Sequence, residues 1–109
     1  MLTISDMQRR AWQNSEDHGF HEIPDIGLPT RLMLIVSELA EAMEDHRNSW
    51  SPSFIRMEGE KPCGIPSELA DVIIRVGDLA GVYGIDLEAA VVQKMAYNAG
   101  RPQKHGKAY

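Results

Sequence analysis

The sequence predicts an all-α protein, a bundle of about four helices in a single domain that spans residues 1–109. Four segments carry apolar residues at helical spacing, and no segment shows the strict alternation of a strand. Clusters of glycine and proline separate the four segments. Because a chain of 109 residues builds only a modest core, we also expect oligomerisation to complete the bundle.

The first predicted helix covers residues 3 to about 18. Thr3 or Ser5 can cap its start, and Gly19 ends it. Its apolar positions are sparse, which predicts one buried side and one polar side; they are Ile4, Met7, Ala11 and Trp12. The prolines and glycine of residues 20–29 indicate a loop.

The second predicted helix runs from residue 30 to about residue 47. It carries an apolar stripe of 3.6-residue periodicity, made of Leu32, Ile35, Val36, Leu39, Ala40 and Met43. Its first half, residues 32–36, is apolar nearly all round, which predicts a central position or a subunit contact. Residues 48–66 have no clear periodicity and are predicted to be a functional or mobile loop.

Clear start and stop signals bound the third and fourth predicted helices. Ser67 is the expected cap of the third helix, and Gly84 ends it. Asp86 is the expected cap of the fourth helix, which reaches about Ala99 before Gly100 terminates it.

Two pairs of carboxylates are the most informative feature of the sequence. Glu38 and Glu41 lie three residues apart in the second helix, and Glu68 and Asp71 repeat this spacing in the third. Residues three apart share a helix face, so each pair points one way. Hard divalent cations prefer carboxylate oxygens, so the pattern predicts a Mg²⁺ site, with Mn²⁺ as a possible substitute. The alternative is two solvated acidic faces, but two pairs within strong apolar stripes favour metal binding.

A basic face near the C-terminus is the second candidate feature. Lys94, Asn98 and Arg101 stand at offsets of four and seven and share one helix face. A basic tail of about residues 100–109 follows. We interpret this face as a site for phosphate oxygens of the substrate. The alternative is a basic helix end that offsets the macrodipole, followed by a frayed tail.

Composition narrows the class of protein. The net charge of -5 and the pI of about 5.3 argue against a general binder of nucleic acid or membrane surfaces. Cys63 is the only cysteine, which fits a reducing, cytoplasmic setting. No signal peptide is predicted, and no apolar run is long enough to span a bilayer.

Taken in order, these motifs resemble the MazG-like, all-α nucleoside triphosphate pyrophosphohydrolases. The likeness covers about residue 30 to the end and rests on residues 37–41, on Pro66 to Arg75 and on the ending from Lys94 to Lys107. One position departs from the family, because Ser37 stands where a further glutamate often precedes the first pair.

The resemblance implies an enzyme that cleaves a nucleoside triphosphate between its α and β phosphates, giving a monophosphate and pyrophosphate. The four acids Glu38, Glu41, Glu68 and Asp71 would then bind Mg²⁺, and Lys94, Asn98 and Arg101 would hold phosphate oxygens. Glu38 or Glu41 can orient the attacking water or take its proton. The family usually works as a homodimer or homotetramer, in nucleotide-pool cleansing or control.

Two other functions are compatible with the same sequence. One is a phosphoribosyl-ATP pyrophosphohydrolase, whose fold and acids are similar. The other is a non-catalytic helical module, such as a regulatory dimer, in which the acids form a solvated face and the basic tail binds a partner.

Overall fold

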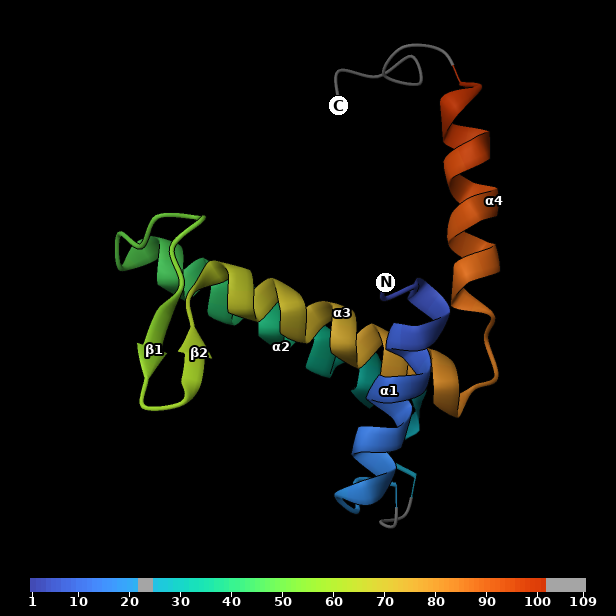
Figure 1. Ribbon diagram of the computed structural model, residues 1–109, viewed down its shortest axis with the longest axis horizontal. Helices are drawn as coiled ribbons and strands as arrows, with labels where there is room; N and C mark the ends of the chain where they lie inside the picture. Colours follow the sequence, from blue (N-terminus) through green and yellow to red (C-terminus); the bar gives the residue numbers. More distant parts are fainter. Residues whose placement is uncertain (22–24, 102–109) are drawn as a thin grey trace.

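The computed structural model describes residues 1–21 and 25–101 and is mostly helical (Figure 1). In chain order its elements are α1 (Ile4–Asp17), α2 (Gly27–Arg47), β1 (Arg56–Glu58), β2 (Lys61–Cys63), α3 (Ile65–Val82) and α4 (Leu87–Ala99). The four predicted helices are confirmed, and a small antiparallel sheet of β1 and β2 is added to them. None of the helices in these residues combines the length and apolarity needed to cross a membrane.

Local capping signals fix the start of α1. The Thr3 hydroxyl oxygen accepts a hydrogen bond from the Asp6 backbone N–H at 3.0 Å, and the Asp6 carboxylate accepts one from the Thr3 N–H at 3.3 Å. This reciprocal pair is a capping box, so Thr3 rather than Ser5 is the cap.

Small residues let α1 cross closely over α3 (Figure 1). Gly77, Ala80 and Gly81 form the contact side of α3, and Ala80 and Ala11 are buried there. A methyl group at Gly81 would lie 2.9 Å from Cβ of Trp12, an atom that cannot move without the α1 backbone. Glycine is therefore required at the crossing for the helices to approach this closely.

Gly81→Ala is expected to destabilise the fold by about 1–3 kcal/mol, despite the better helix propensity of alanine, because it overpacks the crossing. Gly77→Ala is the matched control. Its nearest clash is with Sδ of Met7, the flexible end of a side chain that can rotate away. Urea denaturation of both variants checks the prediction, and equal stability of the two would contradict it.

The second helix presents its predicted stripe mostly to solvent. α2 and α3 run antiparallel, side by side (Figure 1). The α3-facing side of α2 is half-buried and consists of Arg31, Leu34, Ile35, Glu38, Ala42 and Asp45. Five residues of the predicted stripe are exposed instead: Leu32, Val36, Leu39, Ala40 and Met43.

The segment between α2 and α3 contains a hairpin that the sequence interpretation missed. Arg56 pairs with Cys63 and Glu58 with Lys61, around a turn at Gly59 with φ of 62°. The prediction of no strand was wrong because strands of three residues are too short for alternation to be recognised.

The start of α3 also differs from the prediction. Its N-cap is Gly64, with φ of 109°. A Cβ atom at this position would lie only 2.5 Å from the backbone oxygen of Phe54. The Ser67 hydroxyl lies inside the helix and donates to the carbonyl of Pro62 at 2.9 Å, so it ties α3 to β2. The prediction that Ser67 caps the helix was therefore wrong, and α3 begins at Ile65, within the predicted loop of residues 48–66.

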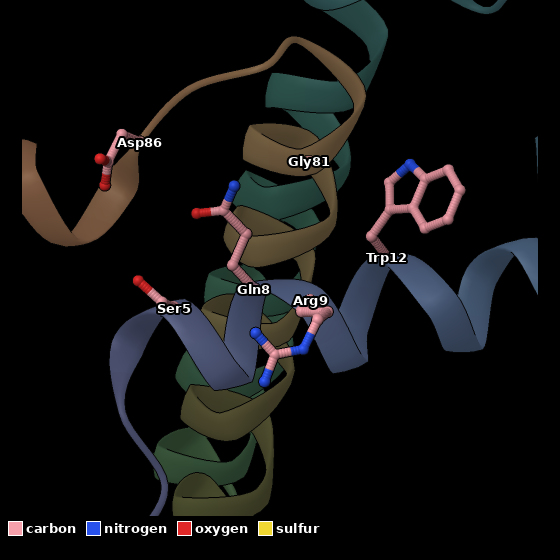
Figure 2. A pocket seen from close by; sticks show the side chains of 6 residues that line it. All are labelled: Ser5, Gln8, Arg9, Trp12, Gly81 and Asp86. Carbon is pink, nitrogen blue, oxygen red and sulfur yellow. The ribbon is translucent and has the colours of Figure 1, made fainter.

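The last helix is capped as predicted, and α1 holds its start through hydrogen bonds of Gln8 and through one from the Ser5 N–H to the Glu88 carboxylate at 3.2 Å. The Asp86 carboxylate accepts a hydrogen bond from the Ala89 N–H at 3.0 Å. Gln8 of α1 reaches the start of α4: its amide donates to the Ile85 carbonyl at 2.7 Å and accepts from the Leu87 N–H at 3.3 Å (Figure 2). From there α4 extends away from the α2–α3 pair (Figure 1).

A histidine joins the residues after α1 to α3. Nδ1 of His21 lies 2.7 Å from the Glu16 carboxylate, and Nε2 lies 2.9 Å from the Asp78 carboxylate. Burial alone would lower the pKa of His21, but the hydrogen bonds to the two carboxylates outweigh it and raise the pKa. An imidazole donates from both nitrogens only when it is protonated. The charged ring therefore stabilises this junction.

His21→Ala is expected to lower the free energy of unfolding by about 1–3 kcal/mol near pH 5.5, because two charge-assisted hydrogen bonds are lost. The loss should be smaller near pH 8.5. The pKa of His21 is raised in the folded state, so its contribution is complete below the ordinary value of 6.5 and disappears as pH rises through the folded value. Urea denaturation at both pH values measures this. His46→Ala, at an exposed histidine, is the control, and a loss independent of pH would contradict the prediction.

Candidate metal centre

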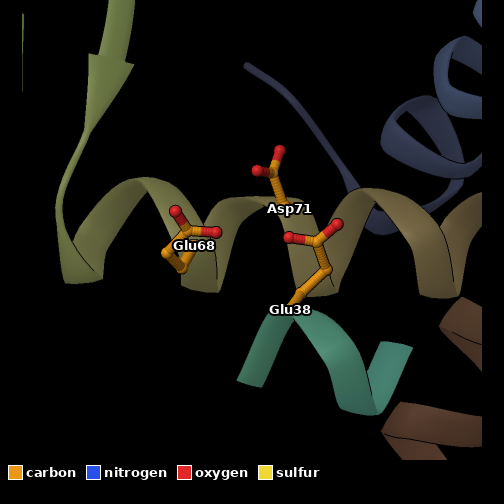
Figure 3. Close-up of side chains that lie close together, drawn as sticks. All are labelled: Glu38, Glu68 and Asp71. Carbon is orange, nitrogen blue, oxygen red and sulfur yellow. The ribbon is translucent and has the colours of Figure 1, made fainter. Parts of the chain in front are cut away.

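Three of the four predicted metal ligands come together at the seam between α2 and α3. Glu38 projects from α2, and Glu68 and Asp71 project from α3 toward the same space (Figure 3). One carboxylate oxygen from each residue lies within 4.8 Å of the others. The antiparallel contact of the two helices therefore unites acids that are thirty residues apart in sequence.

The fourth predicted ligand, Glu41, stands beside this group. It is exposed on α2, one turn after Glu38, and does not belong to the set of three. Its negative charge still contributes to raising the pKa of Glu68. Glu41 is thus close enough to interact electrostatically with the cluster, and its role as a metal ligand stays a prediction.

Burial and the neighbouring negative charges both disfavour the ionised forms of Glu68 and Asp71. Burial, followed by a hydrogen bond with Glu38 and the charges of Glu41, Asp71 and Glu38, raises the pKa of Glu68 to about 7. Burial and the charge of Glu38 raise the pKa of Asp71, although Arg75 and Lys61 act in the opposite direction. A bound cation would offset the repulsion between three carboxylates held this close and favour their ionised forms.

Two arginines at the seam were not predicted as site residues. Nε of Arg75 donates to Oε1 of Glu38 at 2.8 Å, so this guanidinium offsets part of the negative charge. The Arg31 side chain is 14% exposed, and its Nε is buried without a hydrogen-bond partner among the described residues. Spacing alone contained a signal for both, because Arg75 follows Asp71 by four residues and Arg31 precedes Glu38 by seven.

A cavity of about 400 Å³ adjoins the cluster. This volume lies within the range of small-molecule sites. The acids Glu38 and Asp71 line it together with Arg31 and Arg75. The other lining residues, both polar and apolar, are Asn14, Ser15, Phe20, Ile26, Leu34, Ile74 and Asp78. One cavity therefore offers carboxylates for a cation and guanidinium groups for an anion.

The donor set fits Mg²⁺ or Mn²⁺. All three groups are carboxylates, which are hard oxygen ligands, and they come from two helices held rigidly together. Soft ligands that would favour zinc or copper are absent from the cluster as the structure describes it. Ser37, where the resembled family often has a glutamate, donates its hydroxyl to the Leu34 carbonyl at 2.6 Å and adds no carboxylate.

The predicted phosphate-binding face lies elsewhere in the same chain. Lys94 and Asn98 are exposed on α4, and Arg101 follows its end. Lys94 and Arg101 both lie over the ring of Tyr97, with the cations 5.3 and 5.2 Å from its centroid. Because α4 extends away from the α2–α3 pair, one chain does not bring these cations to its own acids (Figure 1). The tail from residue 102 onward lies outside the described residues.

A second cavity, of about 370 Å³, lies between α1, the end of α3 and the start of α4 (Figure 2). Its charged groups already have roles in the fold. Asp86 caps α4, and Arg9 forms an ion pair with Asp6. The three-carboxylate cluster is not part of its lining. The cavity at the α2–α3 seam is therefore the better candidate for chemistry.

Comparison with known proteins gave no match, whether against family models, curated proteins or solved structures. Evidence for the function therefore comes from the site itself and from the motifs of the sequence.

Proposed function

We propose that this chain is a Mg²⁺-dependent nucleoside triphosphate pyrophosphohydrolase with a MazG-like fold that works as a homo-oligomer. The observation that supports it most is the cluster of Glu38, Glu68 and Asp71, which adjoins a cavity that Glu38 and Asp71 line together with Arg31 and Arg75. A triphosphate is a polyanion that enzymes bind through divalent cations and arginine together. The ordered acidic motifs and the basic ending of the sequence support the same class of substrate.

Each group has a chemical task in this proposal. The three clustered carboxylates would hold Mg²⁺, with Glu41 beside them. When bound, Mg²⁺ supplies neutralisation of the triphosphate charge and polarisation of the phosphorus under attack. Glu38 or Glu41 orients the attacking water and takes its proton. Water adds to the α phosphorus, the bond to the bridging oxygen breaks, and pyrophosphate leaves.

The two arginines of the cavity would bind phosphate oxygens. A guanidinium presents several N–H donors in a fixed plane and matches phosphate geometry. Arg31 has an Nε that still lacks a partner among the described residues, and Arg75 is already held in place by Glu38. Both are therefore positioned groups that stabilise negative charge on the substrate or on the leaving pyrophosphate.

The test is a panel of canonical and modified nucleoside triphosphates, together with phosphoribosyl-ATP, incubated with the purified protein and Mg²⁺. The proposal expects a nucleoside monophosphate and pyrophosphate from at least one nucleotide, and no product when EDTA removes the metal. Turnover of phosphoribosyl-ATP alone would indicate the related enzyme of that substrate. Release of orthophosphate, or no turnover of any compound, would contradict the proposal.

A non-catalytic helical module is the second candidate, and the extensive exposed apolar surface of α2 and α4 favours it. Such a module would use this surface to bind a partner, and its acids would remain a solvated face. It predicts no nucleotide turnover and no stabilisation by Mg²⁺. A thermal melt with and without Mg²⁺ therefore separates the two candidates.

A further inference from the structure

The single chain leaves most of its large apolar side chains uncovered. Among residues 1–21 and 25–101, the buried hydrophobic residues are Ala11, Cys63 and Ala80, and no large side chain is fully buried. A stable soluble fold normally hides more apolar surface than this, and extended exposed patches mark contact sites. Among the helices, α2 carries the most of these exposed residues, six, and α3 and α4 carry three each.

On α2 the exposed residues form a seam suited to pairing of helices. Leu32, Val36, Leu39 and Met43 follow one another at spacings of four, three and four, the repeat of a coiled-coil stripe. Their exposed fractions lie between 46% and 55%. The α3-facing side of α2 is a different set of residues, so this seam remains free after the α2–α3 contact has formed.

On α4 the uncovered part is the last eight residues, followed by Gly100. Every residue from 92 to 100 is exposed, including Val92 at 63% and Met95 at 66%. An isolated helix of this length is marginal in water, because nucleation is costly and packing supplies most helical stability. The end of α4 therefore needs a surface to pack on, and its own chain does not supply one (Figure 1).

The charges of α4 and of the α2–α3 seam indicate which surface the end of α4 packs on. After Glu88, α4 and the residue that follows Gly100 contain Lys94 and Arg101 and no acid. The α2–α3 seam carries the three clustered carboxylates of Glu38, Glu68 and Asp71. Lys94 is consecutive with Met95 and so lies about 100° away around the helix axis. A helix seated on its apolar side would thus present its cations along the rim of the contact.

We propose that two copies of this chain associate through the exposed seam of α2 and the exposed end of α4. In this assembly the α4 of one copy brings Lys94 and Arg101 to the acidic cluster of the other. Each acidic site is then completed by cations from the second copy. In a two-fold symmetric dimer the same contact forms twice, so both sites are completed together. The role of these cations toward a phosphate substrate rests on the proposed function, whereas the association does not.

Light scattering after size-exclusion chromatography tests the association. The full chain is expected to be a dimer or larger, and Val36→Lys or Met95→Lys should shift it to monomer. Glu44→Lys and Gln93→Lys are the controls. They place the same side chain on exposed positions of α2 and α4 that belong neither to the α2 seam nor to the pair Val92 and Met95, so the assembly should stay intact. A monomeric parent chain, or equal effects of all four variants, would overturn the proposal.

Cross-linking tests the placement of α4 without any assay of activity. In a Cys63→Ala background, one chain carries Asn98→Cys and a second chain carries Ser37→Cys, next to Glu38 in sequence. A short thiol-reactive cross-linker should join the two different chains after mixing. Chains that each carry both cysteines should form intermolecular rather than intramolecular links. Dimers that give no Asn98–Ser37 link between chains would overturn the placement.

Mixing two inactive variants tests the shared site. Asp71→Asn lacks an acid of the cluster, and Arg101→Ala lacks a cation of α4. In a mixed dimer one site has both its acids and its cations, so a mixture is expected to regain about a quarter of the parent activity. No recovery, with an active parent enzyme, would overturn the inference and leave the proposed function intact. An inactive parent would contradict the proposed function, while light scattering and cross-linking would still decide this inference.

Discussion

Asp71→Asn is expected to lower nucleotide turnover by about 1,000-fold while the fold survives. The substitution keeps the shape of the side chain and removes one of the three carboxylates that meet at the α2–α3 seam. Asparagine is a weaker ligand for a hard cation than a carboxylate, and the loss of a charge would also weaken neutralisation of the triphosphate. Steady-state release of pyrophosphate at saturating Mg²⁺ measures the effect.

The same substitution is expected to raise the melting temperature of the metal-free protein. The carboxyl of Asp71 is partly buried beside that of Glu38, and both effects raise its pKa, so its ionised form is unfavourable in the folded state. A neutral amide removes this repulsion. Lower activity with higher stability is the signature of a functional cluster, since a variant that misfolds would lose both.

Glu44→Gln provides the matched control for this prediction. Glu44 is an exposed carboxylate on α2 that lies outside the cluster, so its neutralisation should change neither turnover nor melting temperature appreciably. If Asp71→Asn retained most of the activity, or if it unfolded the protein, the assignment of Asp71 to a metal site would be wrong.

Signals that act within a few residues made much of the fold predictable. Thr3 and Asp86 each cap a helix through contacts three residues away, and sequence spacing alone indicates such contacts. The hairpin of residues 56–63 was missed because its strands are very short. Gly64 was not identified as the cap of α3, because the close approach of Phe54 that requires a glycine there is a tertiary contact.

The site was predictable only in part, for a similar reason. Helical spacing predicts the pairs Glu38–Glu41 and Glu68–Asp71, and the structure brings Glu38, Glu68 and Asp71 together but leaves Glu41 outside this set of three. Spacing puts Arg31 on the same face of α2 as Glu38, but the packing of that face against α3, which makes Arg31 line the cavity, is not specified by spacing. The distance of Lys94 from the acids depends on the direction in which α4 leaves the body. Tertiary contacts of Ser5 and Gln8 with the start of α4 hold that start in place.

Mg²⁺ is expected to stabilise the protein strongly near pH 8 and only about a third as strongly near pH 5.5. The pKa of Glu68 is raised from 4.5 to about 7, so below pH 7 this carboxyl carries a proton that must leave before a cation binds. Affinity for Mg²⁺ should therefore fall by up to about tenfold per pH unit below 7. With Mg²⁺ at roughly a hundredfold excess over its Kd, the stabilisation near pH 8 is expected to be about 2–3 kcal/mol.

The metal-free protein should show the opposite dependence on pH. Unfolded chains release the Glu68 proton near pH 4.5, whereas the folded chain keeps it until about pH 7. A carboxyl with a raised folded-state pKa stabilises the fold fully below the unfolded value, and this contribution is lost as pH rises through the folded value. Stability without metal should thus decline between about pH 4.5 and 7, the range in which stabilisation by Mg²⁺ begins to grow.

Thermal melts with Mg²⁺ and with EDTA across this pH range measure both trends, and Glu68→Gln is the decisive control. This variant has no proton to release at residue 68, so it should lose the decline without metal and most of the Mg²⁺ effect together. A parent protein whose melting temperature rises equally with Mg²⁺ at pH 5.5 and 8 would show that the ion binds away from Glu68. In that case the repulsion at the α2–α3 seam would need an explanation other than a metal site.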